Sequence, residues 1–233
     1  MATSAKGVTY SLIAAPQHTA GLLGLVIAVS VFSRLFITNR LPTALQNEHL
    51  EVYLFGLAVD WLLFLYVRFG LKRRGVKTVR QLLDDCRWTL ARWLLYAGIA
   101  VGVAFLWLGF AFVLGTFLSM NEEQIGHLRS LVPNGVLDKT VWVILSITAG
   151  FCEEFVYRGY MQQQFRAMTG SLPLAVVLQA LAFGAAHLAF PWQLALMTVF
   201  LGLLLGTVSS WRRSLAPGML FHACSDILTG VLS

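Results

Sequence analysis

The stretch GFCEEFVYRGYMQQQF, residues 150–165, decides the fold. It continues an uncharged run, TVWVILSITAGFC (140–152), and then places Glu153, Glu154 and Arg158 inside the same apolar segment. An ionisable side chain within a membrane span costs about 2.5–3.5 kcal/mol on insertion scales, and such residues by default mark function. The stretch therefore predicts a membrane helix whose charged side chains carry the chemistry of the protein.

The composition places the whole chain in the membrane. Of its 233 residues 58% are hydrophobic and 12% are charged, and the mean hydropathy is +0.72, whereas soluble domains carry about 25% charged residues. Residues 7–33 and 93–121 contain no Asp, Glu, Lys or Arg, and each run exceeds the ~20 residues that a helix needs to span a bilayer. Strands of a membrane barrel would instead alternate over ~10 residues. We expect an all-α, polytopic transmembrane helical bundle.

About seven spans are expected from the apolar runs. Their approximate bounds are 19–37, 51–68, 91–118, 139–165, 172–190, 192–211 and 215–232. A short amphipathic helix at the membrane surface is expected at 78–88, where apolar residues at 79, 82, 83 and 86 recur at helical spacing. The start of the chain lacks the features of a secretory signal, so we expect the first membrane helix to direct insertion. The three cysteines form no pairing motif and predict no disulfide.

The net charge of +6 indicates membrane orientation rather than a nucleic-acid partner. Most of the basic residues lie in the loop region 68–92 and at Arg212 and Arg213. Short loops rich in Lys and Arg normally face the cytoplasm. We therefore expect a multi-pass protein of the cell (plasma) membrane with a cytoplasmic N-terminus, and no binding of nucleic acid.

The two glutamates of the first charged group have different expected surroundings. Glu154 and Arg158 are four residues apart and share a helical face, so they can pair. Glu153 is rotated by about 100° from Glu154 and is expected to have no such partner. An unpaired buried carboxylate suits a general base, while a paired one stays ionised.

Two further groups of ionisable residues follow in the last spans. LAFGAAHLAF (181–190) contains Phe183 and His187, and FHACSDI (221–227) places His222 and Asp226 four residues apart. A carboxylate at that spacing can fix the orientation of the histidine ring.

Each group alone has a structural alternative. His187 could be a hydrogen-bonded histidine near a helix end, Glu154–Arg158 a structural ion pair, and His222–Asp226 a packing contact. Their occurrence together in neighbouring helices favours a shared site. Outside them, Arg34 is expected to extend its charge to the membrane surface, and the sequence offers no account of Asp60.

These three motifs resemble a known family. EEFVYR (153–158) matches EExxxR, FGAAH (183–187) matches FxxxH, and HACSD (222–226) matches HxxxN/D. In order and spacing they are similar to the CPBP family of intramembrane proteases, which includes the CAAX prenyl proteases of the Rce1 type and the Abi bacteriocin-immunity proteins. The resemblance covers about residues 139–230, and the first three spans are only generically similar.

The resemblance implies an endopeptidase that cuts a peptide bond of a membrane-associated or lipidated CAAX-type protein or peptide. Glu153 would activate the attacking water, and His187 would orient it. Glu154 and Arg158 would hold the site in shape, while His222 and Asp226 would stabilise the oxyanion. Residues 121–233 would form the catalytic core in the last four spans. Residues 1–120 would supply N-terminal helices and a cytoplasmic basic loop.

The catalytic type stays open at this point. Glu153, His187 and His222 could supply three ligands to a divalent metal such as zinc, although no HExxH motif is present; activation by Glu153 without metal is slightly favoured. Asp226 stands where prenyl proteases have Asn, and an ionised aspartate would repel an oxyanion. Asp226 is therefore either protonated or placed behind His222.

Two other functions compete with proteolysis. One is a non-catalytic bacteriocin-immunity or binding protein on the same scaffold, against which the intact Glu153, His187 and His222 argue. The other is a proton-coupled transporter, against which the lack of internal repeats argues.

Overall fold

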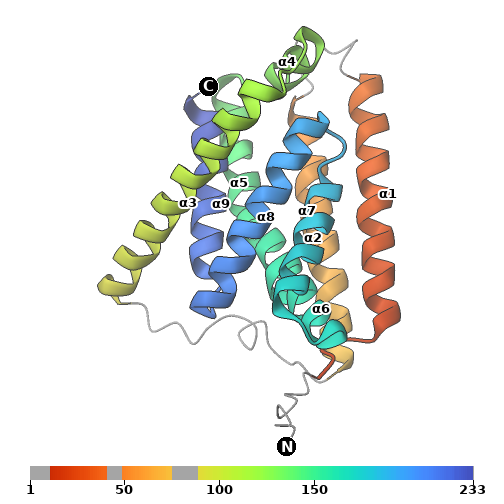
Figure 1. The fold of residues 1–233 in the computed structure, drawn as a ribbon. Coiled ribbons are helices and arrows are strands. Elements are labelled where there is room, and N and C mark those ends of the chain that lie inside the picture. Colours follow the sequence, from red (N-terminus) through yellow and green to blue (C-terminus); the bar gives the residue numbers. More distant parts are fainter. Residues whose placement is uncertain (1–10, 41–48, 75–88, 233) are drawn as a thin grey trace, which may run out of the picture.

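The computed structural model describes residues 11–40, 49–74 and 89–232, and in these residues the only regular structure is helical (Figure 1). The elements are α1 (Pro16–Arg40), α2 (His49–Arg73), α3 (Leu90–Phe117), α4 (Glu122–Arg129), α5 (Gly135–Glu153), η2 (Glu154–Met161), α6 (Gln162–Thr169), α7 (Leu172–Ala186), α8 (Trp192–Arg212) and α9 (Ala216–Leu232). The expected all-α bundle is confirmed. The surface helix expected at 78–88 lies outside the described residues.

Five segments of the described chain are long and apolar enough to cross a membrane: Pro16–Leu35, Leu50–Arg73, Leu90–Phe117, Gly135–Thr169 and Trp192–Arg212. The segment expected at 172–190 is a shorter helix, because α7 has 15 residues and ends at Ala186. Pro191 disfavours a helical conformation at the residue before it, and a turn over His187–Phe190 separates α7 from α8. At 1.5 Å per residue α7 is about 23 Å long, less than the ~30 Å hydrocarbon core. The last helix, α9, has 17 residues.

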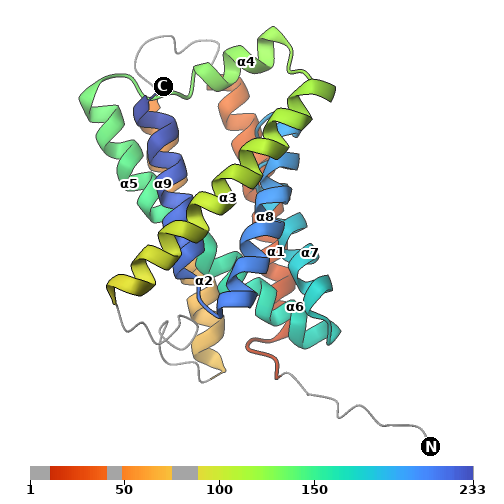
Figure 2. The same ribbon diagram turned by 60° about the vertical axis from the view of Figure 1, so that its left-hand side comes forward.

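The most lipid-exposed helix is α3, which crosses the outside of the bundle against α8 and α9 (Figure 2). Large side chains such as Phe105, Phe112 and Phe117 are at least 73% exposed on it. Because an apolar surface of this kind is stable only in hydrocarbon, α3 faces lipid, and the chain is an integral membrane protein.

The two ends of the bundle differ in charge. At the end that carries α6, the charged residues of the described helix ends and turns are all basic: Lys72, Arg73, Arg74, Arg92, Arg166, Arg212 and Arg213 (Figure 1). We call this the basic end. At the opposite end, which α4 covers, the described residues include Glu51, Glu122, Glu123 and Asp138.

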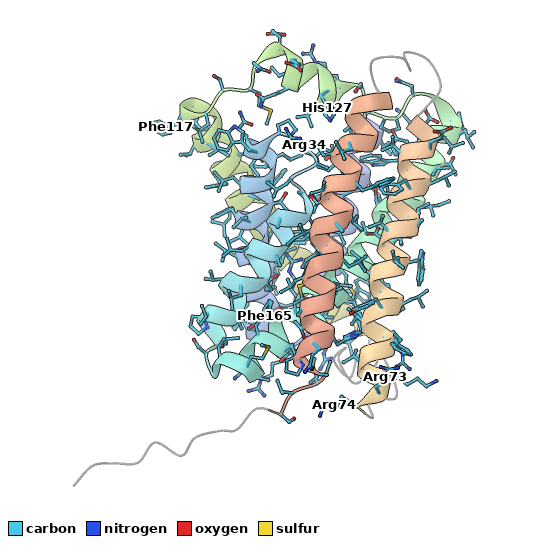
Figure 3. The ribbon with its side chains drawn as sticks, turned by 90° about the vertical axis from the view of Figure 1, so that its right-hand side faces the viewer. Arg34, Arg73, Arg74, Phe117, His127 and Phe165 are labelled. Carbon is cyan, nitrogen blue, oxygen red and sulfur yellow. The ribbon has the colours of Figure 1, made fainter. Side chains whose placement is uncertain are left out.

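The α4 end contains a helix that the apolar pattern did not predict. α4 begins with a capping box in which Asn121 and Gln124 bond to each other's backbone N–H groups. Arg34 lies near His127 at this end, while Arg73, Arg74 and Phe165 lie toward the basic end (Figure 3). Arg34 is exposed and its Nη1 donates to the carbonyl of Leu188 at 3.3 Å, so its charge does reach the end of the span and also ties α1 to the α7–α8 turn.

Candidate active site

The charged stretch at residues 150–165 forms an unusual helix. α5, η2 and α6 are continuous from Gly135 to Thr169, but η2 has π-helical hydrogen bonding, as in the bond from the Gln162 N–H to the Tyr157 carbonyl. All eight η2 residues are buried. π-helical turns are rare and occur frequently at functional sites. The wide turn places Glu154 and Arg158 of the EExxxR motif in the interior.

Glu154 and Arg158 form the expected pair. Glu154 Oε1 lies 2.9 Å from Arg158 Nη1, and both side chains are fully buried. The guanidinium carbon of Arg158 lies 4.3 Å from the centroid of the Phe183 ring, a cation–π contact. Removal of one partner from a buried pair is strongly destabilising, so this pair fixes η2 against α7.

His222 of α9 lies among three carboxylates. Its Nδ1 is 3.4 Å from Glu154 Oε1, and its Nε2 is 3.6 Å from Glu153 Oε2 and 3.5 Å from Asp226 Oδ2. The spacing argument that put His222 beside Asp226 is confirmed. The expectation that Glu153 has no partner is wrong, because α9 packs closely enough to bring the imidazole of His222 beside it.

Small residues and one tryptophan hold α9 in this position. A Cβ atom at Gly150 would lie 2.9 Å from the Cβ of Ala223, so glycine allows α5 and α9 to approach closely. Trp142 Nε1 donates to the carbonyl of Asp226 at 2.7 Å and sets the height of α9 relative to α5.

His187 caps α7 beside this cluster. Its Nδ1 lies 2.9 Å from the Phe183 carbonyl, and its ring meets the Phe183 ring edge-on at 4.9 Å. The Phe183 ring also lies 5.9 Å from the ring of His222. The rings of His187 and His222 therefore both pack against Phe183. Phe183, which the sequence offered only as a motif residue, is the packing centre of the site.

A metal does not fit this arrangement. Over the part of the chain that the structure describes, no group of three or more His, Cys, Asp or Glu side chains is placed to hold a metal ion. Glu153, His187 and His222 are the three ligands that the sequence left open, and zinc would need their donor atoms about 2.0–2.2 Å from one centre. Both histidine rings instead pack edge-on against Phe183, and His187 Nδ1 is engaged with the Phe183 carbonyl.

The structure adds Asp60 to the site. This aspartate of α2 is buried and lies close enough to Glu153, His222 and Asp226 for their charges to interact. In the sequence, the signal was that Asp60 is an acid within an expected membrane span. The sequence could not assign Asp60 a partner, because no fixed residue spacing links α2 to α5 or α9.

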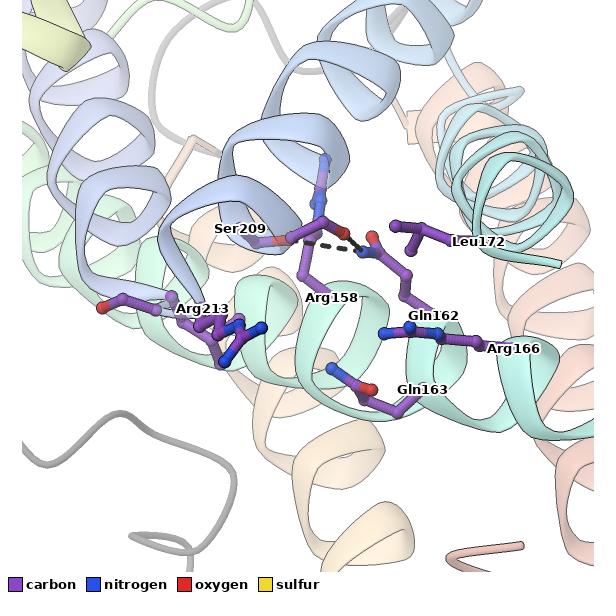
Figure 4. Close-up of a pocket in the computed structure, with 10 residues that line it drawn as sticks. Arg158, Gln162, Gln163, Arg166, Leu172, Ser209 and Arg213 are labelled. Atoms are coloured by element: carbon purple, nitrogen blue, oxygen red, sulfur yellow. Dashed lines mark hydrogen bonds between the residues drawn. The ribbon is translucent and has the colours of Figure 1, made fainter. Parts of the chain in front are cut away.

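A polar cavity of about 490 Å³ lies between η2–α6 and the α8–α9 turn (Figure 4). The residues that line it are Arg158, Gln162, Gln163, Arg166, Leu172, Ser209, Ser210, Arg213, Ser214 and Leu215. Gln162 Nε2 donates to Ser210 Oγ at 2.6 Å and to the Gly206 carbonyl at 3.1 Å. The cavity thus extends from the basic end to Arg158, which contacts Glu154.

The comparisons with known proteins agree with this site. No curated protein and no solved structure matches the chain significantly. Residues 136–228 match the model of a family described as type II CAAX prenyl endopeptidase, Rce1-like. The matched region contains all three motifs and extends over α5, η2 and α6–α8 and most of α9. Residues 136–228, less than half of the chain, are therefore similar to the Rce1-like family of type II CAAX prenyl endopeptidases.

Proposed function

We propose that this protein hydrolyses a peptide bond of a membrane-associated or lipidated, CAAX-type protein or peptide, with Glu153 as the general base. The observation that carries the proposal is the different surroundings of the two adjacent glutamates. Glu154 is fully buried and paired with Arg158, whereas Glu153 is partly exposed, with 19% of its side chain accessible. A base must reach its water, and of the two adjacent glutamates Glu153 is the one that can.

The roles of the other residues follow from their contacts. Glu153 takes a proton from water, which attacks the scissile carbonyl. His222 can donate from Nε2 to the oxyanion that forms, because this nitrogen faces Glu153. Glu154 faces the opposite ring nitrogen, Nδ1, at 3.4 Å and orients the ring from behind. Asp226 lies 3.5 Å from Nε2 itself and favours the charged, donating form of His222. His187 lines the site across Phe183 and orients the water, while Glu154 and Arg158 hold the η2 turn.

The donor set supports a glutamate-type reaction rather than a zinc-bound water. Glu153 and His222 face each other at 3.6 Å with no third ligand arranged around a common centre in the described residues. A general base typically raises the reaction rate by ~10²–10⁴-fold. In the proposed site this contribution comes from the single carboxylate of Glu153.

The charge distribution supports an orientation. Because Lys and Arg are enriched in cytoplasmic loops, we place the basic end, with the start of α1, on the cytoplasmic side of the plasma membrane (Figure 1). The polar cavity of about 490 Å³ opens toward this end and offers water a path to Arg158. Residues 121–233 act as the catalytic core and residues 1–120 support it.

The test compares peptide termini in membranes of cells that produce wild type, Glu153→Ala or Glu123→Ala at equal abundance. Glu123 is an exposed glutamate of α4 and serves as the matched control. New termini with wild type and Glu123→Ala, absent with Glu153→Ala, would establish the protease and identify its substrate. Identical profiles, together with a phenotype that survives Glu153→Ala, would instead favour an immunity or binding protein.

A further inference from the structure

The polar cavity at the basic end is lined by cations and hydrogen-bond donors. Its volume of about 490 Å³ lies within the ~300–1,000 Å³ typical of ligand sites. Three of the lining residues are arginines, Arg158, Arg166 and Arg213, and no acid is among the described residues that line it. Arg158 and Arg166 come from the η2–α6 segment and Arg213 from the end of α8 (Figure 4). The cavity wall is therefore positively charged.

Arg158 has donor atoms that no described residue accepts. The side chain is fully buried, and its Nη1 lies 2.9 Å from Glu154 Oε1. The Nε and Nη2 atoms are also buried and have no hydrogen-bond partner among the described residues. These two atoms form one edge of the guanidinium, whose parallel N–H groups fit two oxygens of a carboxylate or phosphate. Because a buried donor without an acceptor is costly, this edge suits a ligand that brings oxygen atoms.

Two serines of the cavity wall present further donors. Ser210 Oγ accepts from Gln162 Nε2 at 2.6 Å, and the bond from the same nitrogen to the Gly206 carbonyl fixes the orientation of the amide. Ser214 Oγ accepts from the Ala216 N–H at 3.3 Å. Each hydroxyl group therefore keeps its hydrogen to donate, and neither donates to another described residue. The matching ligand is an anion with several acceptor oxygens.

The backbone of Arg213 is in a conformation that favours glycine. Arg213 ends α8 with φ of 50° and ψ of 38°, and it is the one non-glycine residue with positive φ in the described part of the chain. Helix C-termini attract basic side chains, which accounts for Arg166 and Arg212 in the last turns of α6 and α8. Such attraction requires no left-handed backbone. Residues held in this region cluster at ligand clamps and active sites, so the Arg213 side chain is indicated as a ligand contact.

The cavity lies at the depth of the lipid headgroups. Trp211, in the last turn of α8, is 65% exposed, and exposed tryptophans of membrane proteins prefer the headgroup level. Basic pockets between helices on the cytoplasmic side bind the phosphate groups of anionic lipids. A substrate peptide fits less well, because Glu153, His187 and His222 are not among the residues that line the cavity.

We propose that this cavity binds a phosphate group, with the headgroup of an anionic phospholipid as its source at the membrane surface. The free edge of Arg158 binds two phosphate oxygens, Arg166 and Arg213 supply further positive charge, and the hydroxyl groups of Ser210 and Ser214 donate to the same group. Soluble phosphate has the same chemistry, and the test separates the two sources. The site goes beyond the proposed function, because it lies apart from the catalytic cluster and holds a ligand that is not cleaved.

The binding test uses the full chain purified in a neutral detergent. The protein is titrated at fixed ionic strength with a short-chain phosphatidylglycerol, with the matching phosphatidylcholine or with inorganic phosphate. The rise in melting temperature gives an apparent Kd for each ligand. We expect wild type to bind phosphatidylglycerol at least about 10-fold more tightly than phosphatidylcholine, because only the former carries a net negative charge for the arginines.

Arg213→Gly removes a ligand contact without straining the fold, because glycine adopts positive φ at no steric cost. Its melting temperature without ligand should equal or exceed that of wild type. Its apparent Kd for phosphatidylglycerol should rise about 10–100-fold, as expected for the loss of a charge-assisted contact. Arg212→Gln is the matched control. It loses the same charge one residue away, but Arg212 lies 5.2 Å from the Trp211 ring and does not line the cavity, so Kd should stay within about threefold.

The outcomes separate the possible ligands. Binding of phosphatidylglycerol that depends on Arg213 and not on Arg212 would establish the site with a lipid as its source. Stabilisation by inorganic phosphate alone, lost in Arg213→Gly, would establish the same phosphate site with a soluble source.

Three results would overturn the proposal. The first is that neither lipid nor phosphate stabilises wild type. The second is equal weakening in Arg213→Gly and Arg212→Gln, which would mean that only diffuse surface charge acts. The third is a raised KM for a peptide substrate in Arg213→Gly without any effect of phosphate, which would assign the cavity to a peptide carboxylate. Because the melting experiments require no cleavage, failure of the proposed function would leave the phosphate site standing.

Discussion

A Cβ atom at Gly218 would lie 2.6 Å from Oε2 of Glu154. The backbone of α9 and the buried carboxylate of η2 therefore approach each other only because residue 218 has no side chain. This close approach also sets the position of His222, one turn later on the same helix.

Gly218→Ala should consequently impair catalysis. The added methyl group must displace the Glu154 carboxylate or shift α9, and a misplacement of about 1 Å can cost ~10²-fold in rate. We expect kcat to fall about 10–100-fold in a liposome cleavage assay. Gly102→Ala on α3 is the control, because a Cβ there would meet nothing within 4 Å. Full activity of Gly218→Ala would mean that the site tolerates such a shift.

The Glu154–Arg158 pair should matter for stability and activity in separable ways. Arg158→Leu leaves Glu154 buried without its guanidinium partner, and loss of one partner of a buried pair costs about 3–5 kcal/mol. The double change Glu154→Leu with Arg158→Leu removes both charges and should recover most of that free energy of unfolding while remaining inactive. Thermal unfolding in detergent measures the first effect and cleavage the second. An equally unstable double variant would contradict this account.

Asp226→Asn distinguishes two roles for that position. Asp226 lies 3.5 Å from His222 Nε2, and an asparagine keeps an oxygen that can accept a hydrogen bond but loses the charge. We expect kcat to fall about 10-fold, less than for Glu153→Gln, because the orientation of the ring is only partly lost. A variant with wild-type kcat would instead make residue 226 a direct donor to the oxyanion.

Chelation of metals should leave the activity intact. Glu153, His187 and His222 do not converge on one centre, so the proposed reaction uses no zinc-bound water. Dialysis against a strong zinc chelator should change the cleavage rate by less than about twofold. A loss that added zinc restores would show that the three residues rearrange around a metal.

The docking of α4 should depend on pH. Burial of His127, and next the charge of Arg34, lower the pKa of the His127 imidazole below its usual value. In the unfolded chain the pKa of a histidine is about 6.5. Because the folded protein lowers the pKa of His127, protonation of this ring destabilises the folded state. Its contribution to stability is complete above pH ~6.5 and is lost as the pH falls below that value. Amide hydrogen exchange in α4 should accelerate between pH 7.5 and 5.5, and His127→Gln should remove this dependence.

The sequence could predict the contacts between side chains that lie four residues apart on one helix. The contacts of Glu154 with Arg158 and of His222 with Asp226 both span four residues, so they depend only on the helix itself. The contact between Glu153 and His222 depends on how closely α5 and α9 pack, which single glycines decide and no spacing reveals.

The rest of the site could not be predicted for the same reason. Asp60 stood without a partner in the sequence because the neighbours Glu153, His222 and Asp226 are 93 to 166 residues away along the chain. The end of α7 at Ala186 was missed because apolar composition continues through LAF (188–190) after the helical backbone has stopped.

The short helices around the site have a consequence for the surrounding lipid. α7 at 15 residues and α9 at 17 residues are both shorter than the ~20 residues that match an average bilayer. A membrane adapts to short hydrophobic segments by thinning next to them. Lipids with long acyl chains resist such thinning, so the thickness of the host membrane becomes a determinant of how deeply His187 and His222 are immersed.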